Sequence, residues 1–263
     1  MNLSTCTRWI LALLFLCAVS PAGAVELGEA GCHVLELPAV ISEPGHYCLE
    51  RDWDLDLFGG GFAIDIRSDY VVVDFQGHQV RNVPGLVPGE YGWATYGVYA
   101  WERSHIAVRN GLLAGFRYGV VLSEETKDGT VSRNHLVEGM RIHFCQRTGI
   151  LLTAQTSVIR DNIISDITGF EQSEATGILV LRGGGNRVLD NEISRVTGGT
   201  LNRWGIRFEG GTRNLAAGNR LYATQRGILM DYGTVYRDNF GLELQSGYPA
   251  FSGGTDAGGN FWN

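Results

Sequence analysis

Short apolar tetrads recur along most of the chain, and each begins with glycine followed by a β-branched residue. In each tetrad apolar residues alternate with a more variable position, which is the pattern of a half-buried strand. The glycines are spaced 22, 30, 28, 28 and 22 residues apart. The copies begin at Gly97, Gly119, Gly149, Gly177, Gly205 and Gly227, after a degenerate first copy at Ala63.

A second strand-like patch follows each tetrad, and an asparagine follows that patch. These asparagines are Asn110, Asn134, Asn162, Asn191, Asn219 and Asn239. A unit of 22 to 30 residues with three short strands cannot bury its apolar faces alone, but stacked copies can. The repeat therefore predicts an all-β solenoid of about seven coils, in which the six asparagines stack as a hydrogen-bonded ladder at one bend.

Other architectures explain the pattern less well. A βαβ sheet needs helical crossovers, and no run of helical period separates the predicted strands. An antiparallel sandwich requires neither equal spacing nor asparagines in register.

The tetrads, the asparagines and the opening segment Val71-Val72-Val73-Asp74-Phe75-Gln76-Gly77-His78 resemble the single-stranded right-handed parallel β-helix of the pectin-lyase-like superfamily, in particular its exported bacterial repeat proteins. The resemblance covers about Gly61 to Leu244. It is specific for the fold and unspecific for activity, because the superfamily includes lyases, hydrolases, epimerases, esterases and non-catalytic proteins. In its enzymes the substrate usually lies along the outer face of the first sheet, which here contains the tetrads.

The repeat also sets the expected organisation of the chain. Residues 1–24 have a basic residue, a short apolar run and an A-x-A-like end, which is typical of a secretory signal peptide. Residues 25–60 are expected to form an N-terminal cap, 61–245 the β-helix repeats, and 246–263 a Gly-rich C-terminal tail or cap. We therefore expect a periplasmic or secreted protein without a membrane span.

Export changes the interpretation of the cysteines. Cys6 and Cys17 leave with the signal peptide, so Cys32, Cys48 and Cys145 remain. A Cys32–Cys48 bridge would close a loop of about 15 residues. Cys145 is expected to be a buried thiol. No spacing typical of a metal site is present, and we expect no metal or other cofactor.

Composition narrows the range of partners. The chain of 263 residues is 44% hydrophobic and carries a formal charge of −7, which argues against nucleic acid as a partner. Four arginines precede tetrads, Arg117, Arg147, Arg203 and Arg226, and could follow a polyanionic polysaccharide. The alternative for these arginines is pairing with acidic residues in nearby turns.

If the tetrads form the first sheet, two groups of functional side chains lie on its outer face. Tyr99 and Trp101, approached by Trp93, are candidate sugar contacts. Arg207, Glu209 and Asp231 fall on adjacent coils and are the candidate catalytic residues, with the arginine binding a uronate carboxylate and the two carboxylates dividing into acid and base. The alternative for the second group is a solvated salt-bridge cluster.

Two classes of function therefore remain open. The first is binding and processing of an extended acidic polysaccharide, by lyase or epimerase chemistry at a uronate or by glycoside hydrolysis. The second is a non-catalytic scaffold or interaction module of the cell envelope. The oligomeric state cannot be predicted from the sequence.

Overall fold

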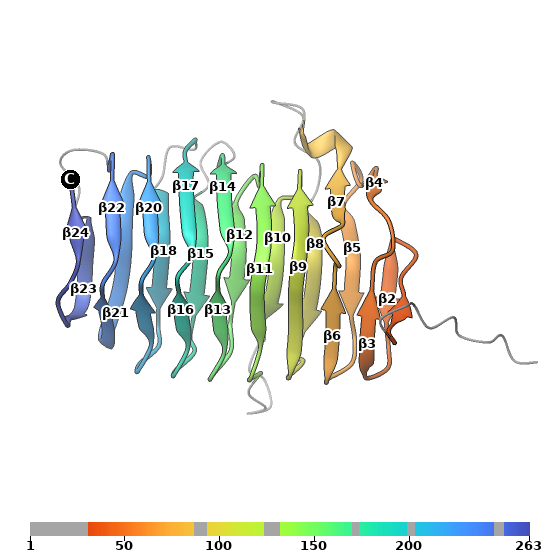
Figure 1. The fold of residues 1–263 in the computed structure, drawn as a ribbon, viewed down its shortest axis with the longest axis horizontal. Coiled ribbons are helices and arrows are strands. Elements are labelled where there is room, and N and C mark those ends of the chain that lie inside the picture. The colour runs from red at the N-terminus through yellow and green to blue at the C-terminus, as the bar shows by residue number, and fades with distance from the viewer. Residues whose placement is uncertain (1–30, 87–93, 124–131, 170–173, 199–202, 245–249) are drawn as a thin grey trace, which may run out of the picture.

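A computed structural model describes residues 31–86, 94–123, 132–169, 174–198, 203–244 and 250–263. In these ranges the chain winds into a right-handed parallel β-helix, with successive coils stacked along one axis (Figure 1). The predicted signal peptide and Trp93 lie outside the described residues.

The tetrads form the first sheet. Its strands pair in parallel in the order in which they follow along the chain. They are β2 (Ala39–Ile41), β5 (Gly61–Ile66), β8 (Thr95–Trp101), β10 (Tyr118–Ser123), β12 (Thr148–Leu152), β15 (Ala175–Leu181), β18 (Arg203–Glu209), the first part of β21 (Arg226–Arg237) and β23 (Phe251–Asp256).

The second sheet follows the first after a bend in each coil. Its strands are β3 (Gly45–Cys48), with β1 (His33–Val34) paired to it, β6 (Val71–Asp74), the first parts of β9 (Ile106–Ala114) and β11 (Leu136–His143), β13 (Val158–Arg160), β16 (Arg187–Leu189), β19 (Leu215–Ala217) and the last part of β21.

The third sheet completes each coil. It contains β4 (Trp53–Leu55), β7 (Gln79–Asn82), the last parts of β9 and β11, β14 (Ile163–Ile167), β17 (Glu192–Val196), β20 (Arg220–Tyr222), β22 (Phe240–Leu242) and β24 (Phe261–Trp262). A 3₁₀ helix, η1 (Val83–Leu86), follows β7. Parallel pairing thus continues on both sides of 61–245, because β2–β4 stack on β5–β7 and β23–β24 on β21–β22.

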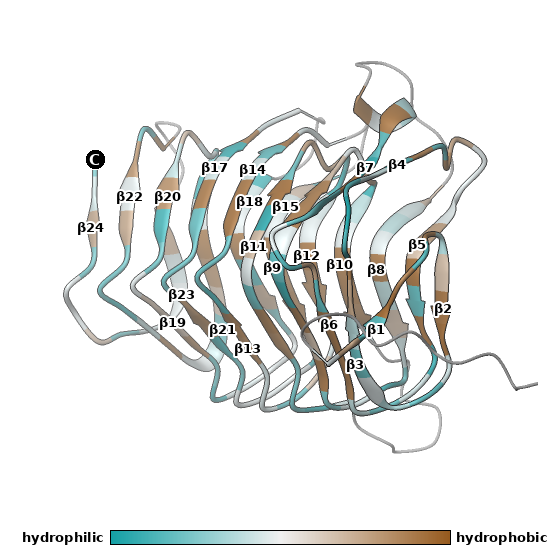
Figure 2. Ribbon diagram, turned by 45° about the vertical axis from the view of Figure 1, so that its right-hand side comes forward, coloured by the Kyte–Doolittle hydropathy of each residue, from teal (hydrophilic) through white to brown (hydrophobic). Residues whose placement is uncertain are grey.

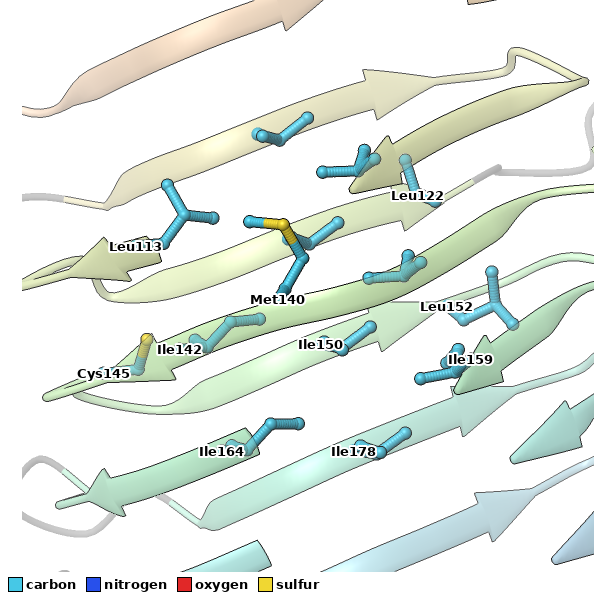
Figure 3. Close-up of a cluster of buried hydrophobic side chains, with 14 of the residues drawn as sticks. Leu113, Leu122, Met140, Ile142, Cys145, Ile150, Leu152, Ile159, Ile164 and Ile178 are labelled. Carbon is cyan, nitrogen blue, oxygen red and sulfur yellow. The ribbon is translucent and has the colours of Figure 1, made fainter. Parts of the chain in front are cut away.

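The core runs the length of the solenoid. The second residue of each tetrad is fully buried, and these side chains stack strand over strand. Figure 2 shows hydrophobic segments alternating with polar ones around the coils, and Figure 3 shows Leu122, Leu152, Ile150 and Ile178 of successive coils within one buried cluster.

The first residue of each tetrad is glycine because the coils leave no room for a side chain. A Cβ on Gly149 would lie 2.7 Å from the carbonyl oxygen of Gly177 and 2.7 Å from Cγ2 of Ile164. A Cβ on Gly119 or on Gly177 would likewise clash with the carbonyl oxygen of the next tetrad glycine and with the side chain of an isoleucine in the third sheet. The repeated glycine therefore marks the corner where the third sheet packs against the first.

An asparagine ladder runs along the bend between the second and third sheets. Asn162, Asn191, Asn219 and Asn239 are buried, and each donates its side-chain amide to the Oδ1 of the next asparagine at 2.9–3.1 Å. The same Oδ1 atoms accept the backbone N–H of the preceding asparagine. Asn260, within the segment predicted as a tail, is the last member of this ladder.

The ladder prediction is wrong for Asn110 and Asn134. Strand register places Gly111 and Met140 at the ladder position, so Asn110 lies one residue before it. Asn110 has a φ of 58° and bonds to Asp74 instead. Asn134 lies before β11, at the bend between the first and second sheets, where its Oδ1 accepts the Thr156 hydroxyl. Left-handed turn positions accept asparagine readily, so the residue type alone did not distinguish these turns from the ladder.

A second polar column, which no repeat in the sequence predicts, runs along the bend between the first and second sheets. It consists of the buried residues His135, Ser157, Asn186 and Asn214. The backbone N–H of each of the first three bonds to the side-chain oxygen of the next, at 2.8–3.0 Å. His135 in turn accepts the N–H of Ile106 at Nδ1. Because its residue types differ from coil to coil, the column leaves no simple repeat in the sequence.

The cysteines are arranged as expected. Cys32 and Cys48 form a disulfide that ties the start of the described chain to the end of β3. Cys145 is a buried free thiol, and burial raises its pKa to about 12.

Candidate functional site

The outer face of the first sheet carries the members of both predicted groups that the structure describes; Trp93 is not among them. Strand register aligns the variable third positions of successive tetrads in one column. It contains Asp65, Tyr99, Val121, Leu151, Leu179, Arg207 and Leu229. Tyr99 and Arg207 are four strands apart, or about 19 Å at the usual strand spacing. The apolar stretch between them separates two polar ends.

An aromatic platform occupies the N-terminal end of this face. We define it as Phe62, Tyr96, Tyr99, Trp101 and Tyr118, from β5, β8 and β10. Tyr96 and Tyr118 stack with ring centroids 5.1 Å apart, and Phe62 lies 5.1 Å from Tyr96 and 4.7 Å from Tyr99.

The platform extends to the predicted sugar contact Trp101, whose ring stacks with that of Tyr99 at 6.3 Å. Trp101 is 37% exposed and the other four rings are half-buried. Burial raises the pKa values of Tyr96 and Tyr99, so both phenols keep their protons and can donate hydrogen bonds at neutral pH. Phe62 and Tyr118 were not among the predicted sugar contacts, although both are aromatic residues in register with Tyr96 on neighbouring strands.

Two arginines flank the platform. Arg147 donates to the Tyr118 hydroxyl at 2.8 Å, and its guanidinium carbon lies 5.7 Å from the centre of that ring. Arg117 immediately precedes Tyr118, and its Nε is buried without a hydrogen-bond partner. Within the described part of the chain, neither guanidinium is paired with a carboxylate. This end of the face therefore combines rings with positive charge.

The arginine column predicted before the tetrads is interrupted. Arg117, Arg147 and Arg203 share a register position, but Ala175 occupies it between the last two. Arg226 is in register with Trp204 and its guanidinium carbon lies 4.8 Å from the centre of that ring. Among the described residues, the alternative of pairing with acidic side chains is therefore not found for Arg117 and Arg147.

A charged cluster lies at the other end of the face. Arg207 bonds to Glu209 through Nη2 at 3.0 Å and to Glu174 through Nη1. The Arg207 side chain is only 17% exposed, whereas that of Glu209 is 54% exposed. We call Glu174, Arg207 and Glu209 the arginine–carboxylate cluster; its formal charge is −1.

The carboxylate that joins this cluster is Glu174 rather than Asp231. Asp231 accepts the backbone N–H of Gly210 instead, and no bond joins it to Glu209 or Arg207 in the described chain. Glu174 directly precedes β15 in the chain. Its role depends on a contact across 33 residues, which the repeat could not indicate.

Among the residues that the structure describes, no group of three or more His, Cys, Asp or Glu side chains is placed to hold a metal ion. The described residues also contain no helix long and apolar enough to span a membrane.

Comparison with known proteins gives one family and several similar structures. A family model described as "Right handed beta helix region" matches residues 96–243, more than half of the chain. Among curated proteins, none matches the sequence.

Three solved structures illustrate the similarity. The enzymatically active domain of tailspike protein 2 of bacteriophage CBA120 has a TM-score of 0.61 at 11% identity, over 81% of this chain and 35% of that one. An alginate lyase from Paenibacillus sp. str. FPU-7 gives 0.54 at 13%, over 85% and 90%. A tailspike variant of E. coli bacteriophage HK620, in complex with a pentasaccharide, gives 0.57 at 12%, over 88% and 42%. The chain thus spans about a third of the first structure, and these low identities indicate a shared fold.

Proposed function

The chain belongs to the family of right-handed β-helix proteins, and from this premise we propose that it is an exported protein that binds an extended acidic polysaccharide along the outer face of its first sheet. The observation that carries the proposal is the aromatic platform with two arginines beside it that have no carboxylate partner in the described chain. Rings of this kind bind the apolar faces of sugars, and guanidinium groups bind carboxylates.

The solved structures give the proposal further support. One similar protein is named an alginate lyase, and another was solved with a bound pentasaccharide. The disulfide Cys32–Cys48 supports export, because such bonds persist in oxidising compartments.

The arginine–carboxylate cluster suggests how a bound uronate would be processed. Arg207 already holds two carboxylates, so a substrate carboxylate would have to replace one of them. Glu209 is the more exposed partner and the one expected to leave. Released from Arg207, Glu209 would lie beside the sugar and accept its C5 proton. The C4–O bond then breaks, the C4=C5 double bond forms, and the leaving oxygen takes a proton from water.

Binding is tested with pectate, alginate and an uncharged glucan by isothermal titration calorimetry. We expect the two acidic polymers to bind, and Tyr99→Ala or Trp101→Ala to weaken binding about tenfold through loss of the ring contact. Arg147→Gln should weaken binding of the acidic polymers only. Tyr232→Ala is the matched control, because Tyr232 is 95% exposed and lies outside the platform. Unchanged affinity in the platform variants would contradict the proposal.

Processing is tested by the ultraviolet absorbance of unsaturated uronate product. Parent protein should form product, and Glu209→Gln should lower kcat at least a hundredfold because the proton acceptor is lost. Asp231→Asn should retain most activity, since the Asp231 carboxylate binds backbone rather than Arg207. Binding without product from either polymer would leave a non-catalytic binding module, the second function class.

A further inference from the structure

A groove follows the bend between the second and third sheets, on a different face from the platform. One of its hollows, of about 600 Å³, is bordered by β7, β9 and β11, which lie side by side in Figure 1. Its lining includes Asp52, Gln79, Asn110, Leu112 and Arg141. Neither the platform nor the arginine–carboxylate cluster contributes to it.

Glycines at the bend make room for this hollow. Gly77 and Gly139 have φ values of +85° and +60°, and Asn110 occupies the equivalent position of the coil between them with a φ of 58°. A Cβ on Gly77 would contact nothing within 4 Å, so its missing side chain leaves open space. The left-handed turn at this bend favours glycine, and the missing side chain leaves space for the hollow.

The cation in the hollow is available to a ligand. Arg141 lies on the exposed side of β11, and within the described chain its guanidinium has no ion pair or hydrogen bond. The neighbouring charges on the second sheet are already neutralised, because Arg109 pairs with Asp74 and Arg160 with Glu138. The positive charge of Arg141 is therefore the one that an anionic ligand would meet here.

The rest of the lining contains both hydrogen-bond acceptors and hydrogen-bond donors. Asp52 accepts the Gln79 side-chain amide at Oδ2 and the Gln79 backbone N–H at Oδ1. These hydrogen bonds and that from His78 hold the pKa of Asp52 below its ordinary value, so it stays an acceptor. Asn110 donates to Asp74 and leaves its Oδ1 beside Gly139. Leu112 supplies an apolar contact between these polar groups.

We propose that this hollow is a second carbohydrate site, which binds a short acidic oligosaccharide with a carboxylate on Arg141 and hydroxyl groups on Asp52, Gln79 and Asn110. A bare phosphate or sulfate fits less well, because the Asp52 carboxylate would repel it and most of the volume would remain unfilled. The hydroxyls of a sugar can donate to Asp52, while its carboxylate accepts from Arg141.

A second hollow in the same groove provides an internal comparison. Its volume is about 300 Å³, and its lining includes Asp161, Asp190, Glu192 and Arg220. Three carboxylates against one arginine give this lining a formal charge of −2, which disfavours an anionic ligand. Arg141 and Arg220 occupy equivalent positions of the third sheet, three coils apart. We therefore assign the acidic sugar to the hollow at Arg141 and not to the hollow at Arg220.

Backbone amide NMR with trigalacturonate as the probe tests the assignment, with maltotriose as the uncharged comparison. Trigalacturonate should shift the amides of Gly77, Gly111 and Gly139, which line the hollow. Arg141→Gln should weaken this binding about tenfold, whereas the matched control Arg220→Gln should leave it unchanged. Asn110→Gly, which keeps a backbone suited to positive φ, should also weaken it.

The second site shares no residue with the platform, so different variants test the two sites separately. Tyr99→Ala should leave the shifts of the three glycines intact even where it abolishes binding to the first sheet. No shift at these glycines, or equal shifts with maltotriose, would overturn the second site while leaving the proposed function standing. Loss of the shifts in Arg220→Gln to the same degree as in Arg141→Gln would also overturn it.

Discussion

At the scale of single residues, the position in the coil decides which residue type fits. Glycine begins a tetrad because two coils meet there, and asparagine fills the ladder because its side chain both donates and accepts. His135 has a comparable role in the second polar column, where its imidazole bonds to the backbone of a neighbouring coil. Its Nδ1 accepts the N–H of Ile106 at 3.2 Å, and its Nε2 lies 2.6 Å from the Ser132 hydroxyl. Only the neutral ring can accept at Nδ1.

This requirement makes stability dependent on pH. Burial, assisted by His105, lowers the pKa of His135 from 6.5 to about 4. Between pH 4 and pH 6.5 the unfolded chain binds more protons than the folded one, so stability is lost as the pH falls through this window. We expect the loss to reach about 3 kcal/mol, measured by urea unfolding at a series of pH values.

His135→Asn provides the control for this prediction. Asparagine occupies the same column at Asn186 and Asn214, so the variant keeps an acceptor but has no group that titrates in the window. Its stability should depend less on pH by the amount attributed to His135. Identical pH profiles for the two proteins would show that His135 does not titrate as proposed.

At the scale of elements, the side chains at the bends contribute as much to strand register as the strands themselves. The strands in a coil are short, and several contain only three residues. Two of the three bends in each coil carry a polar column, and these columns hold the register because each buried side chain bonds to the backbone of the adjacent coil. An unmatched member would leave a buried donor or acceptor without a partner.

Asn191 tests the importance of the ladder. Its side-chain amide donates to Asn219 and to the carbonyls of Ile159 and Leu189, and its Oδ1 accepts from Asn162. Asn191→Ala removes these bonds inside the protein and should reduce the free energy of unfolding by about 2–5 kcal/mol. Urea denaturation followed by circular dichroism measures the loss.

The comparison variant is Asn134→Gly, at an asparagine that the repeat suggested but that lies outside the ladder. Asn134 is exposed, and glycine accepts its φ of 58°, so we expect a change below about 1 kcal/mol. If the two variants were equally destabilised, the ladder would have no special energetic role.

At the scale of the molecule, a solenoid is stabilised by contacts between neighbouring coils, so its ends are expected to open before its middle. The Cys32–Cys48 disulfide ties down one end, next to the coil formed by β2, β3 and β4. Asn260 and β24 continue the ladder and the third sheet at the other end.

Removing the disulfide should therefore act locally. The paired cysteines are 16 positions apart in the sequence, and we expect the double variant Cys32→Ser/Cys48→Ser to lose about 3 kcal/mol of stability. Hydrogen exchange should accelerate in β2 and β3 and remain unchanged in β14 and β17. A reducing agent should reproduce this pattern in the parent and have no effect on the variant. Uniform acceleration along the chain would argue against local opening.

The repeat pattern was sufficient to predict the architecture. Its glycines and isoleucines recur because each coil must meet identical constraints from its neighbours, and this repetition placed Tyr99 and Arg207 in one outward column. Which side chains meet across coils could be seen only in the folded chain. Glu174 joins Arg207 in place of Asp231, Asn110 and Asn134 lie outside the ladder, and Arg141 has no partner among the described residues around its hollow. Contacts of this kind join residues 20 to 36 positions apart, and they depend on loop paths and on the register of each bend.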